Sequence, residues 1–355
     1  MKAFVIICLT TVLALVVGTS VQAAVSSEEA AWQKVVEAAK KEGVVNFSTT
    51  TFVGTAGVAL SKAFKDKYGI SLELITGKTS ARTEKVKMEQ ISKNYITDAF
   101  DGLSPATLKR AGYLESVAEA LPVLKEKNRF LRSPIEDPPE AQVLATLTSN
   151  STFWYNTNLV KPGEEPKSYH DLLDPKWKGK IYLNNPLYGE SPDGHMAAFV
   201  RARILTEDYF IKLYKNGTLA GVGGPKEIVE KLARGEFAIG GVMGADDPMA
   251  VFLAGAPIKP LDLKEGTWVR AMKLAAVKNP PHPNATKVFI NWMLSKEGQL
   301  EVTKAVGVGG IRNDIPSVLP FSFKAPALYE TYESMLFSEE RYSKHYMANL
   351  LGIRR

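Results

Sequence analysis

The sequence predicts an α/β protein with two lobes, and three observations support that prediction. Short apolar segments typical of buried strands alternate with segments of helical periodicity, which favours a largely parallel sheet. This alternation occurs twice, and an extended segment, residues 143–155, separates the two sets. The chain of 355 residues is also long enough to form two hydrophobic cores.

The first set begins with a helix on which Trp32, Val35, Val36 and Ala39 recur at helical spacing before Gly43. Predicted strands at 44–47, 70–74 and 99–101 then alternate with helices. In a parallel sheet, the loops that follow strands lie beside helix N-termini, whose free N–H groups bind anions. The loops after the first two strands therefore become candidate ligand contacts.

Prolines interrupt this pattern at residues 134–139, because proline removes a backbone donor and restrains the residue before it. The second set follows the extended segment. It comprises predicted strands at 181–183, 237–242 and 267–277, and helices after Gly194, at 207–216, at 225–234, at 247–255 and from Asn284. Residues 321–355 are rich in Tyr, Glu and Lys, which predicts a helical extension on the surface.

The first 24 residues have the pattern of a secretory signal peptide. Lys2 precedes an apolar run that ends at Gly18, and the segment 21–24 ends in two alanines. The run is short for a membrane span, although an N-terminal anchor is the alternative. We therefore expect a protein secreted to the periplasm, with the signal peptide cleaved off.

Cysteine and charge content exclude several classes of function. Cys8, the only cysteine, lies in the predicted signal peptide, so the mature chain has neither disulfides nor thiol chemistry. The chain has 44 Lys and Arg against 38 Asp and Glu; without Lys2, 43 against 38 leaves a net charge of +5. This dispersed excess favours an anionic ligand or is a surface balance, and it is not typical of nucleic-acid binding.

A series of short segments is informative through its order and spacing, although each segment is weak on its own. The segments are Ala38–Gly43, Ala63–Ile70, Tyr155–Pro162, Leu172–Ile181, Ala233–Glu236, Gly255–Pro257, Glu265–Thr267 and Leu294–Gln299. Together they resemble the extracellular solute-binding proteins of ABC transporters, in the branch that includes ferric-iron binders. The resemblance covers nearly the whole mature chain.

This resemblance implies the type II periplasmic binding protein fold, in which two lobes close over a ligand about a two-strand hinge. Each lobe would be a mixed sheet flanked by helices. The expected boundaries are 25–152 with 244–279 for lobe 1, 153–243 with 280–320 for lobe 2, and 321–355 for the extension. The basic run 176–180 then leads into the first strand of the second lobe and is not a nucleic-acid patch.

The resemblance also implies a receptor that delivers its ligand to an ABC permease in the inner membrane. We expect a monomer without enzymatic activity, cofactor or nucleic-acid partner. A secreted hydrolase or lyase is an alternative, but it would need a nucleophile with its base or paired carboxylates, and no Gly-x-Ser-x-Gly motif occurs. A sensor with the same fold is a third possibility.

The iron-binding branch holds ferric ion with two adjacent tyrosines from the second lobe and a histidine and a glutamate from the first. By resemblance, the tyrosines would fall near Met243 and Gly244, the histidine in the loop 49–51, and the glutamate in the loop 102–104. None of these positions carries the required side chain. The sequence therefore favours a small anionic organic ligand, with ferric iron or an iron chelate as the alternative.

Hydroxyl groups and backbone N–H groups at helix N-termini suit carboxylate, phosphonate or sulfonate oxygens. Arg82 either adds a bidentate contact or is a solvated arginine in a first helical turn. Tyr155 either stacks on the ligand or packs in the hinge, and Asp246 either binds an amine or serves an ordinary helix start. The candidate ligand-binding residues are Thr49, Thr50, Thr51, Ser80, Arg82, Tyr155, Asn184, Ser191, His195, Gly244 and Asp246.

The four histidines, His170, His195, His282 and His345, lack the spacing of metal ligands, so no metal site is expected. Of these, His195 alone lies near the predicted cleft, where it would serve as a ligand donor.

Overall fold

The computed structural model describes residues 27–353 except 103–104, 188–190, 245, 323 and 343. The predicted signal peptide, residues 1–24, lies outside the described residues. Within residues 27–353, apart from those gaps, no helix combines the length and the apolar character needed to cross a membrane.

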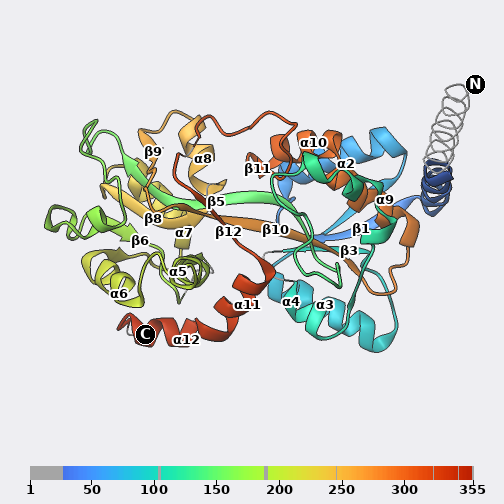
Figure 1. Ribbon diagram of the computed structural model, residues 1–355, viewed down its shortest axis with the longest axis horizontal. Coiled ribbons are helices and arrows are strands. Elements are labelled where there is room, and N and C mark those ends of the chain that lie inside the picture. The colour runs from blue at the N-terminus through green and yellow to red at the C-terminus, as the bar shows by residue number, and fades with distance from the viewer. Residues whose placement is uncertain are drawn as a thin grey trace, which may run out of the picture.

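The protein has two lobes at opposite ends of its longest axis, joined by two long strands (Figure 1). Strand β5 (Leu144–Asn156) and strand β10 (Thr267–Val277) pair antiparallel and run through both lobes. This confirms the predicted α/β fold, with its mixed sheets flanked by helices. The extended segment of the sequence is β5, and its return partner is β10.

The first lobe places a sheet in the order β2-β1-β3-β10 between helices. Strands β1 and β2 are parallel to each other, β1 and β3 are parallel, and β3 is antiparallel to β10. Its elements up to the hinge are helical residues 27–42, β1 (Val44–Thr49), α2 (Gly54–Tyr68), β2 (Ser71–Thr76), α3 (Thr79–Ser92), β3 (Ala99–Gly102), α4 (Ala106–Arg110), β4 (Leu114–Glu115) and the 3-10 segments Ala118–Ala120, Pro122–Lys125 and Lys127–Arg129.

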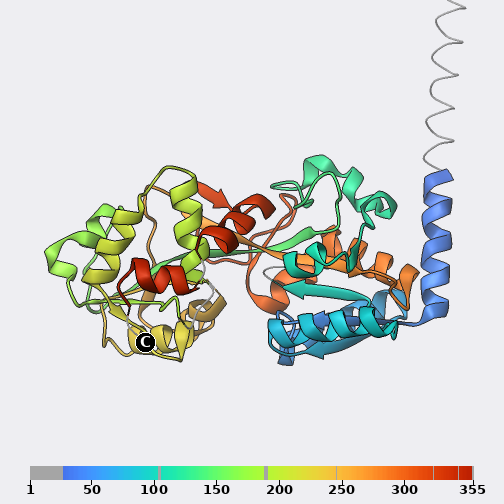
Figure 2. The ribbon, with the colours of Figure 1, turned by 90° about the horizontal axis from the view of Figure 1, so that it is seen from below.

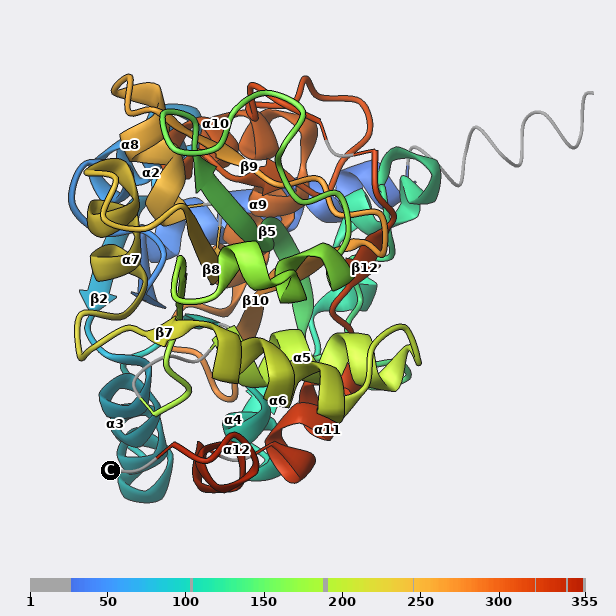
Figure 3. The same cartoon turned by 90° about the vertical axis from the view of Figure 1, so that its left-hand side faces the viewer.

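The second lobe continues the sheet as β5-β8-β6-β7, with β6 parallel to both β8 and β7. Figure 3 faces this lobe and labels its strands β5, β8 and β7. Its elements are the 3-10 segments His170–Leu173 and Pro175–Trp177, β6 (Ile181–Leu183), α5 (Ser191–Arg201), α6 (Glu207–Asn216), β7 (Thr218–Leu219), α7 (Gly224–Ala233), β8 (Ile239–Gly244), α8 (Asp246–Leu253) and β9 (Ile258–Pro260).

Helix α5 begins three residues before Gly194, although the sequence predicted a start after that glycine. The reason is packing. A Cβ atom at position 194 would lie 2.4 Å from a ring carbon of Trp268, so glycine allows the first turn of α5 to lie directly on this ring. The glycine is therefore needed inside the helix for a close approach, and it does not mark the start of the helix.

Residues 283–311 belong to the first lobe, so the expectation that 280–320 lie in the second lobe is wrong for this part of the range, whereas Leu319 packs with the second lobe. Helix α9 (Pro283–Leu294) packs on β1, and helix α10 (Lys296–Val306) packs on α2 before β11 (Gly309–Gly310). Phe289 lies 4.9 Å from Phe47 and 5.3 Å from Phe64 between ring centroids. Strand β10 ends in the first lobe. Because the connection from β10 to α9 is short, α9 packs in the same lobe.

The segment 244–266 lies with the second lobe, so only the later part of the expected range 244–279 reaches the first. Strand β9 pairs with β5 at residues 154–156, and Met249 of α8 shares a core with Trp154 and Ile258. The chain therefore leaves the second lobe only once, along β10.

The C-terminal segment contains the predicted helices, α11 (Tyr332–Arg341) and α12 (Lys344–Leu350), but it is not a surface appendage. Its strand β12 (Ala327–Tyr329) pairs in parallel with residues 267–269 of β10. Helix α11 packs on α5, and Tyr342 and Met347 are buried in the core of the second lobe. Tyrosine-rich composition therefore provides core residues here.

Replacing Phe289 with alanine should cost about 3–5 kcal/mol of unfolding free energy, because a buried ring that contacts two other rings leaves a cavity. Urea unfolding followed by fluorescence measures this loss. Val222→Ala is the matched control, since that side chain is 84% exposed and should change little. Equal effects of the two substitutions would contradict the placement of α9 in a core.

Candidate functional site

The hinge strands carry a polar patch between the two hydrophobic cores. Ser149 pairs with Arg270 across β5 and β10, and Ser151 pairs with Trp268. Directly opposed residues share a face of a sheet, and alternate residues along a strand share it too, so these four side chains point the same way. We call Ser149, Ser151 and Arg270 the hinge floor.

Apolar pairs flank the hinge floor on the same face of the sheet. Leu147 and Met272 form a pair that joins the core of the first lobe, and Phe153 and Trp268 join the core of the second. The hinge floor therefore lies where one core ends and the other begins. This is the position at which two lobes of this fold face each other.

Arg270 is a buried cation with 7% of its surface exposed, and its guanidinium carbon lies 5.7 Å from the centre of the Trp268 ring. Ser151 is fully buried, and its hydroxyl has no hydrogen-bond partner among the described residues. A buried hydroxyl is costly without a partner, and here it lies beside a buried cation, which makes such a patch a candidate binding site. The sequence analysis missed both residues, although an arginine inside an apolar strand was a usable signal.

The loop after β1 is the part of the first lobe that borders the hinge floor. The buried carboxylate of Asp101 on β3 holds this loop in place. Thr49 donates its hydroxyl to Asp101 at 2.6 Å, and the backbone N–H of Thr50 donates to the other oxygen at 2.9 Å. The hydroxyl of Thr51 contacts the sulfur of Met272 at 3.7 Å. Thr51 therefore lies beside the hinge, on the face that carries Arg270.

Arg82 lies in the first turn of α3 but is buried, so the alternative of a solvated arginine is wrong. Its guanidinium donates to the hydroxyl of Ser48 at 3.0 Å, to the carbonyl of Asp101 at 2.8 Å and to the carbonyl of Gly77 at 3.2 Å. Burial raises the pKa of the Asp101 carboxyl, and hydrogen bonds from the threonine loop and the charge of Arg82 oppose that rise. In this arrangement Arg82 ties the strands β1 and β3 to the turn before α3.

The second lobe contributes the ends of two strands to the same region. Gly244, at the end of β8, pairs with Ser151 of the hinge floor. Asn184 follows β6, is fully buried, and donates its backbone N–H to Gly241 of the neighbouring strand β8 at 3.2 Å. Helix α5 starts nearby because Gly194 rests on Trp268.

Three further candidates lie at helix starts. Ser80 is exposed in the first turn of α3, Ser191 is the first residue of α5, and Asp246 is the first residue of α8. The side chains of Ser191 and Asp246 lie outside the described part of the structure. A ligand role for these three residues stays a prediction.

Tyr155 does not lie in the cleft. It pairs with Ile239 at the start of β8, whereas Ser151 pairs with Gly244 at the end of that strand. Four residues of extended chain separate Tyr155 from Ser151, which is about 13 Å along the strand. Tyr155 instead lines a surface pocket together with Glu165, Lys167 and other residues on the outer side of the second lobe.

His195 is a core residue and not an accessible ligand donor. It is fully buried, its ring stacks on Phe199 at 4.9 Å, and its Nε2 atom lies 3.0 Å from the hydroxyl of Tyr169. Burial lowers its pKa from 6.5 to about 3, so the imidazole is neutral at neutral pH. The sequence placed it near the cleft because residues 191–195 were expected to precede a helix. They instead form the first turns of α5, which directs the ring of His195 into the core.

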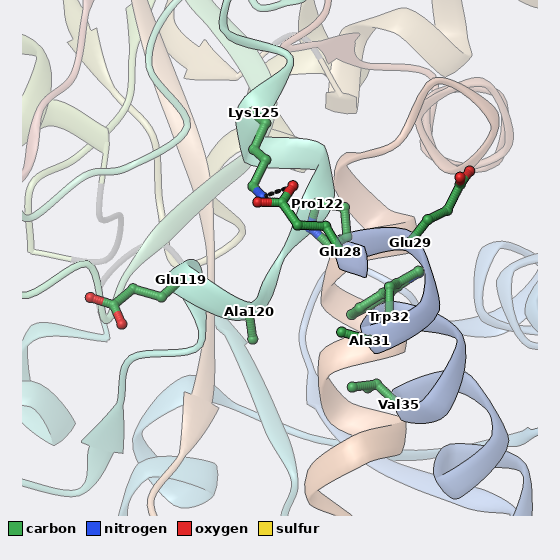
Figure 4. Close-up of a pocket in the computed structure, with 9 residues that line it drawn as sticks. All are labelled: Glu28, Glu29, Ala31, Trp32, Val35, Glu119, Ala120, Pro122 and Lys125. Atoms are coloured by element: carbon green, nitrogen blue, oxygen red, sulfur yellow. Dashed lines mark ion pairs between the residues drawn. The ribbon is translucent and has the colours of Figure 1, made fainter. Parts of the chain in front are cut away.

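A large apolar pocket of about 630 Å³ lies elsewhere, against helix 27–42 at the outer end of the first lobe (Figure 4). Trp32 and Val35 form one wall, and an ion pair between Glu28 and Lys125 spans its rim. This pocket is remote from the hinge floor and has no cluster of convergent polar groups. Its size alone does not identify a ligand site.

No three His, Cys, Asp or Glu side chains of the described residues gather in a geometry that could hold a metal ion. Met243 is buried in the core of the second lobe, and Gly244 offers only backbone. The positions at which resemblance placed the tyrosine pair therefore carry no phenolate.

The family model of the bacterial extracellular solute-binding proteins matches residues 59–330 of this chain. The chain therefore belongs to this family. The matched range includes both hinge strands and both lobes, which agrees with the two-lobed α/β fold of periplasmic binding proteins.

Similar proteins include several that are named for iron. Iron uptake protein A1 from Synechocystis sp. is 25% identical over 260 residues, which is 66% of this chain and 67% of that protein. A Trichodesmium IdiA (FutA) structure in complex with iron and citrate superposes with a TM-score of 0.71 at 21% identity, covering 88% of this chain and 100% of that one. The periplasmic binding protein AfuA from Actinobacillus pleuropneumoniae, with bound fructose-6-phosphate, gives a TM-score of 0.64 at 21% identity, covering 87% and 96%.

The buried state of His195 predicts a pH dependence of stability. The pKa of His195 is lowered in the folded protein. The unfolded chain therefore binds a proton at this histidine below about pH 6.5, whereas the folded chain binds it only near pH 3. Stability is therefore lost as the pH falls through this window, by about 1.4 kcal/mol per pH unit from this group.

His195→Gln should remove that contribution and flatten the dependence of unfolding free energy on pH between 6.5 and about 4. Urea unfolding at a series of pH values provides the measurement. His170→Gln, at an exposed histidine, leaves His195 in place and should keep the slope of the unmodified protein. Parallel slopes for all three proteins would disprove the buried neutral imidazole.

Proposed function

We propose that this protein is a periplasmic receptor that binds a small anionic organic ligand between its lobes and delivers it to an ABC permease. The observation that carries this proposal is the hinge floor, where the buried cation of Arg270 lies beside the hydroxyls of Ser149 and Ser151. An arginine and hydroxyl donors together suit the oxygens of a carboxylate or a phosphoryl group.

Further features support an anion at this position. The starts of α3 and α5 follow strand ends that border the hinge, and helix N-termini favour negative charge. The loop 49–51 is neutral and is held in place by Asp101 within the lobe. A phosphorylated sugar or an organic acid has an anionic group that suits the guanidinium of Arg270, and AfuA with its bound fructose-6-phosphate is a precedent in this fold.

Iron is the alternative, and the similar proteins favour it over the main proposal, because they include Iron uptake protein A1 and a structure that holds iron with citrate. A bare ferric ion requires hard anionic side chains, which the positions 243–244 and 49–51 do not supply. An anionic chelate would instead present carboxylate oxygens to Arg270. The chelate version of the iron hypothesis therefore fits the described residues better than a bare ion.

The remaining parts of the proposal follow from the family. A receptor of this kind has no catalytic role, acts as a monomer, and reaches the periplasm through a cleaved signal peptide. Residues 1–24 carry the sequence pattern for that step. The permease partner is proposed on the same basis.

Arg270→Gln should weaken binding of an anionic ligand by about 10- to 100-fold, since one hydrogen-bonded charge contributes about 1.5–3 kcal/mol. Isothermal titration calorimetry of the protein, stripped of ligand by unfolding and refolding, measures the affinity for fructose 6-phosphate and for citrate. Arg234→Gln is the matched control, because this arginine pairs with Glu236 on the surface. Unchanged affinity in Arg270→Gln would overturn the proposed site.

The same titration decides between the candidates. Ferric citrate and citrate are compared at equal concentration with the unmodified protein. Tight binding of ferric citrate with weak binding of citrate and of fructose 6-phosphate would favour the iron-chelate alternative. Binding of the organic anion without iron supports the main proposal.

A further inference from the structure

A buried ionic cluster lies behind the hinge. The ammonium group of Lys273 is fully buried on β10 and forms an ion pair with Glu330, which follows β12. Arg132 donates to the backbone carbonyl of Glu330 at 2.8 Å and forms an ion pair with Glu136. The charges therefore compensate each other around the point where the C-terminal segment leaves β10.

This cluster and the hinge floor lie on opposite faces of the same strand. Arg270 and Lys273 are three positions apart on β10, and an odd separation places two side chains on opposite faces. Arg270 shares its face with Met272, which contacts the loop 49–51. The Lys273–Glu330 pair therefore lies on the back of the hinge.

The C-terminal segment connects this cluster to the second lobe. We call residues 327–353 the C-terminal strap. Beyond Glu330, its helix α11 packs on α5 (Figure 2). Tyr342 donates its hydroxyl to Glu207 of α6 at 2.8 Å. Met347 of α12 is buried in the core of the second lobe. The strap is thus anchored firmly to one lobe.

The other end of the cluster belongs to the first lobe. Arg132 and Glu136 lie on the loop between the 3-10 segment 127–129 and β5, and Ile135 of this loop packs against the core of the first lobe. The ring of Tyr329 lies 5.3 Å from the guanidinium carbon of Arg132. The strap therefore adds a third connection between the lobes, besides β5 and β10.

A pocket of about 520 Å³ opens beside this connection. It is lined by Arg132 and Glu136 from the first lobe, by Arg201 of α5, and by Glu333 of the strap. The back of the hinge is therefore not solidly filled, so the lobes have room to approach or separate there.

We propose that the C-terminal strap is a conformational device that favours the open state of the receptor. A rotation about the two hinge strands that closes the cleft must separate the surfaces on the opposite face. Closure therefore stretches the contacts of Glu330 with Lys273 and Arg132, while opening preserves them. Binding of the ligand must supply the free energy that these contacts lose on closure. The strap therefore lowers the affinity for the ligand and favours its release.

This inference rests on the proposed binding of ligand between the lobes, but its test does not need the ligand. The mature chain lacks cysteine, so spin labels can be placed at Ala81→Cys and Lys226→Cys. These exposed positions lie in the first turns of α3 and α7, which follow the strand ends of the two lobes. Pulsed electron paramagnetic resonance then measures the distance across the cleft.

The double variant Lys273→Met with Glu330→Gln removes both charges together, which avoids leaving one buried charge alone. We expect the ligand-free distance distribution to shift to shorter values. Affinity for fructose 6-phosphate should rise about three- to tenfold, in proportion to the population shift. Glu333→Gln breaks only the pair with Arg201 inside the second lobe and should leave the distances unchanged.

Unchanged or longer distances in the double variant would overturn the proposal. If the double variant does not fold, Arg132→Met with Glu136→Gln replaces it, since these substitutions remove the contact to the carbonyl of Glu330 from the first-lobe side without leaving a buried carboxylate unpaired. Shorter distances without tighter binding of fructose 6-phosphate support the strap and contradict the proposed ligand class instead.

Discussion

The pairing of β5 with β10 is the constraint on which the rest of the structure depends. These strands pair from Leu144 to Ser151 against Leu274 to Trp268. The chain first enters the second lobe along β5 and leaves it along β10, and it returns there through the C-terminal strap. Because their side chains alternate, one face carries Arg270 of the hinge floor and the other carries Lys273, which pairs with Glu330 of the strap. A single strand pair therefore sets the lobe boundary, the candidate anion site and the connection behind the hinge.

The candidate site is assembled from parts that are each held by burial. Asp101 fixes the loop 49–51 of the first lobe, Trp268 fixes the start of α5 through Gly194, and the strand pair fixes Arg270 between them. Because the site is pre-organised, little binding free energy is lost in ordering it. The binding free energy of the ligand can therefore stabilise the closed lobes. This is the physical basis for treating the protein as a receptor.

The fold could be predicted from periodicity, because strands and helices alternate clearly in both halves. The lobe boundaries could not, since α9 is a largely apolar helix that either lobe could have buried. Tertiary contacts with Phe47 and Phe64 decide the outcome. Candidates that follow strand ends, such as Thr51 and Gly244, border the hinge as the sequence suggested. His195 and Tyr155 do not, because helix phase and strand register determine which way and how far a side chain reaches. Arg270 was not among the candidate ligand-binding residues, because an arginine within a predicted strand indicates an edge or a surface position of a sheet.

Native mass spectrometry of the protein purified from its periplasm without denaturation tests the central claim most directly. Comparison of its mass before and after acid unfolding gives the mass of whatever lies between the lobes. The account predicts an added small organic acid, carrying a carboxylate or phosphoryl group, that is lost in Arg270→Gln. An added mass of one iron atom alone, retained in Arg270→Gln, would contradict it.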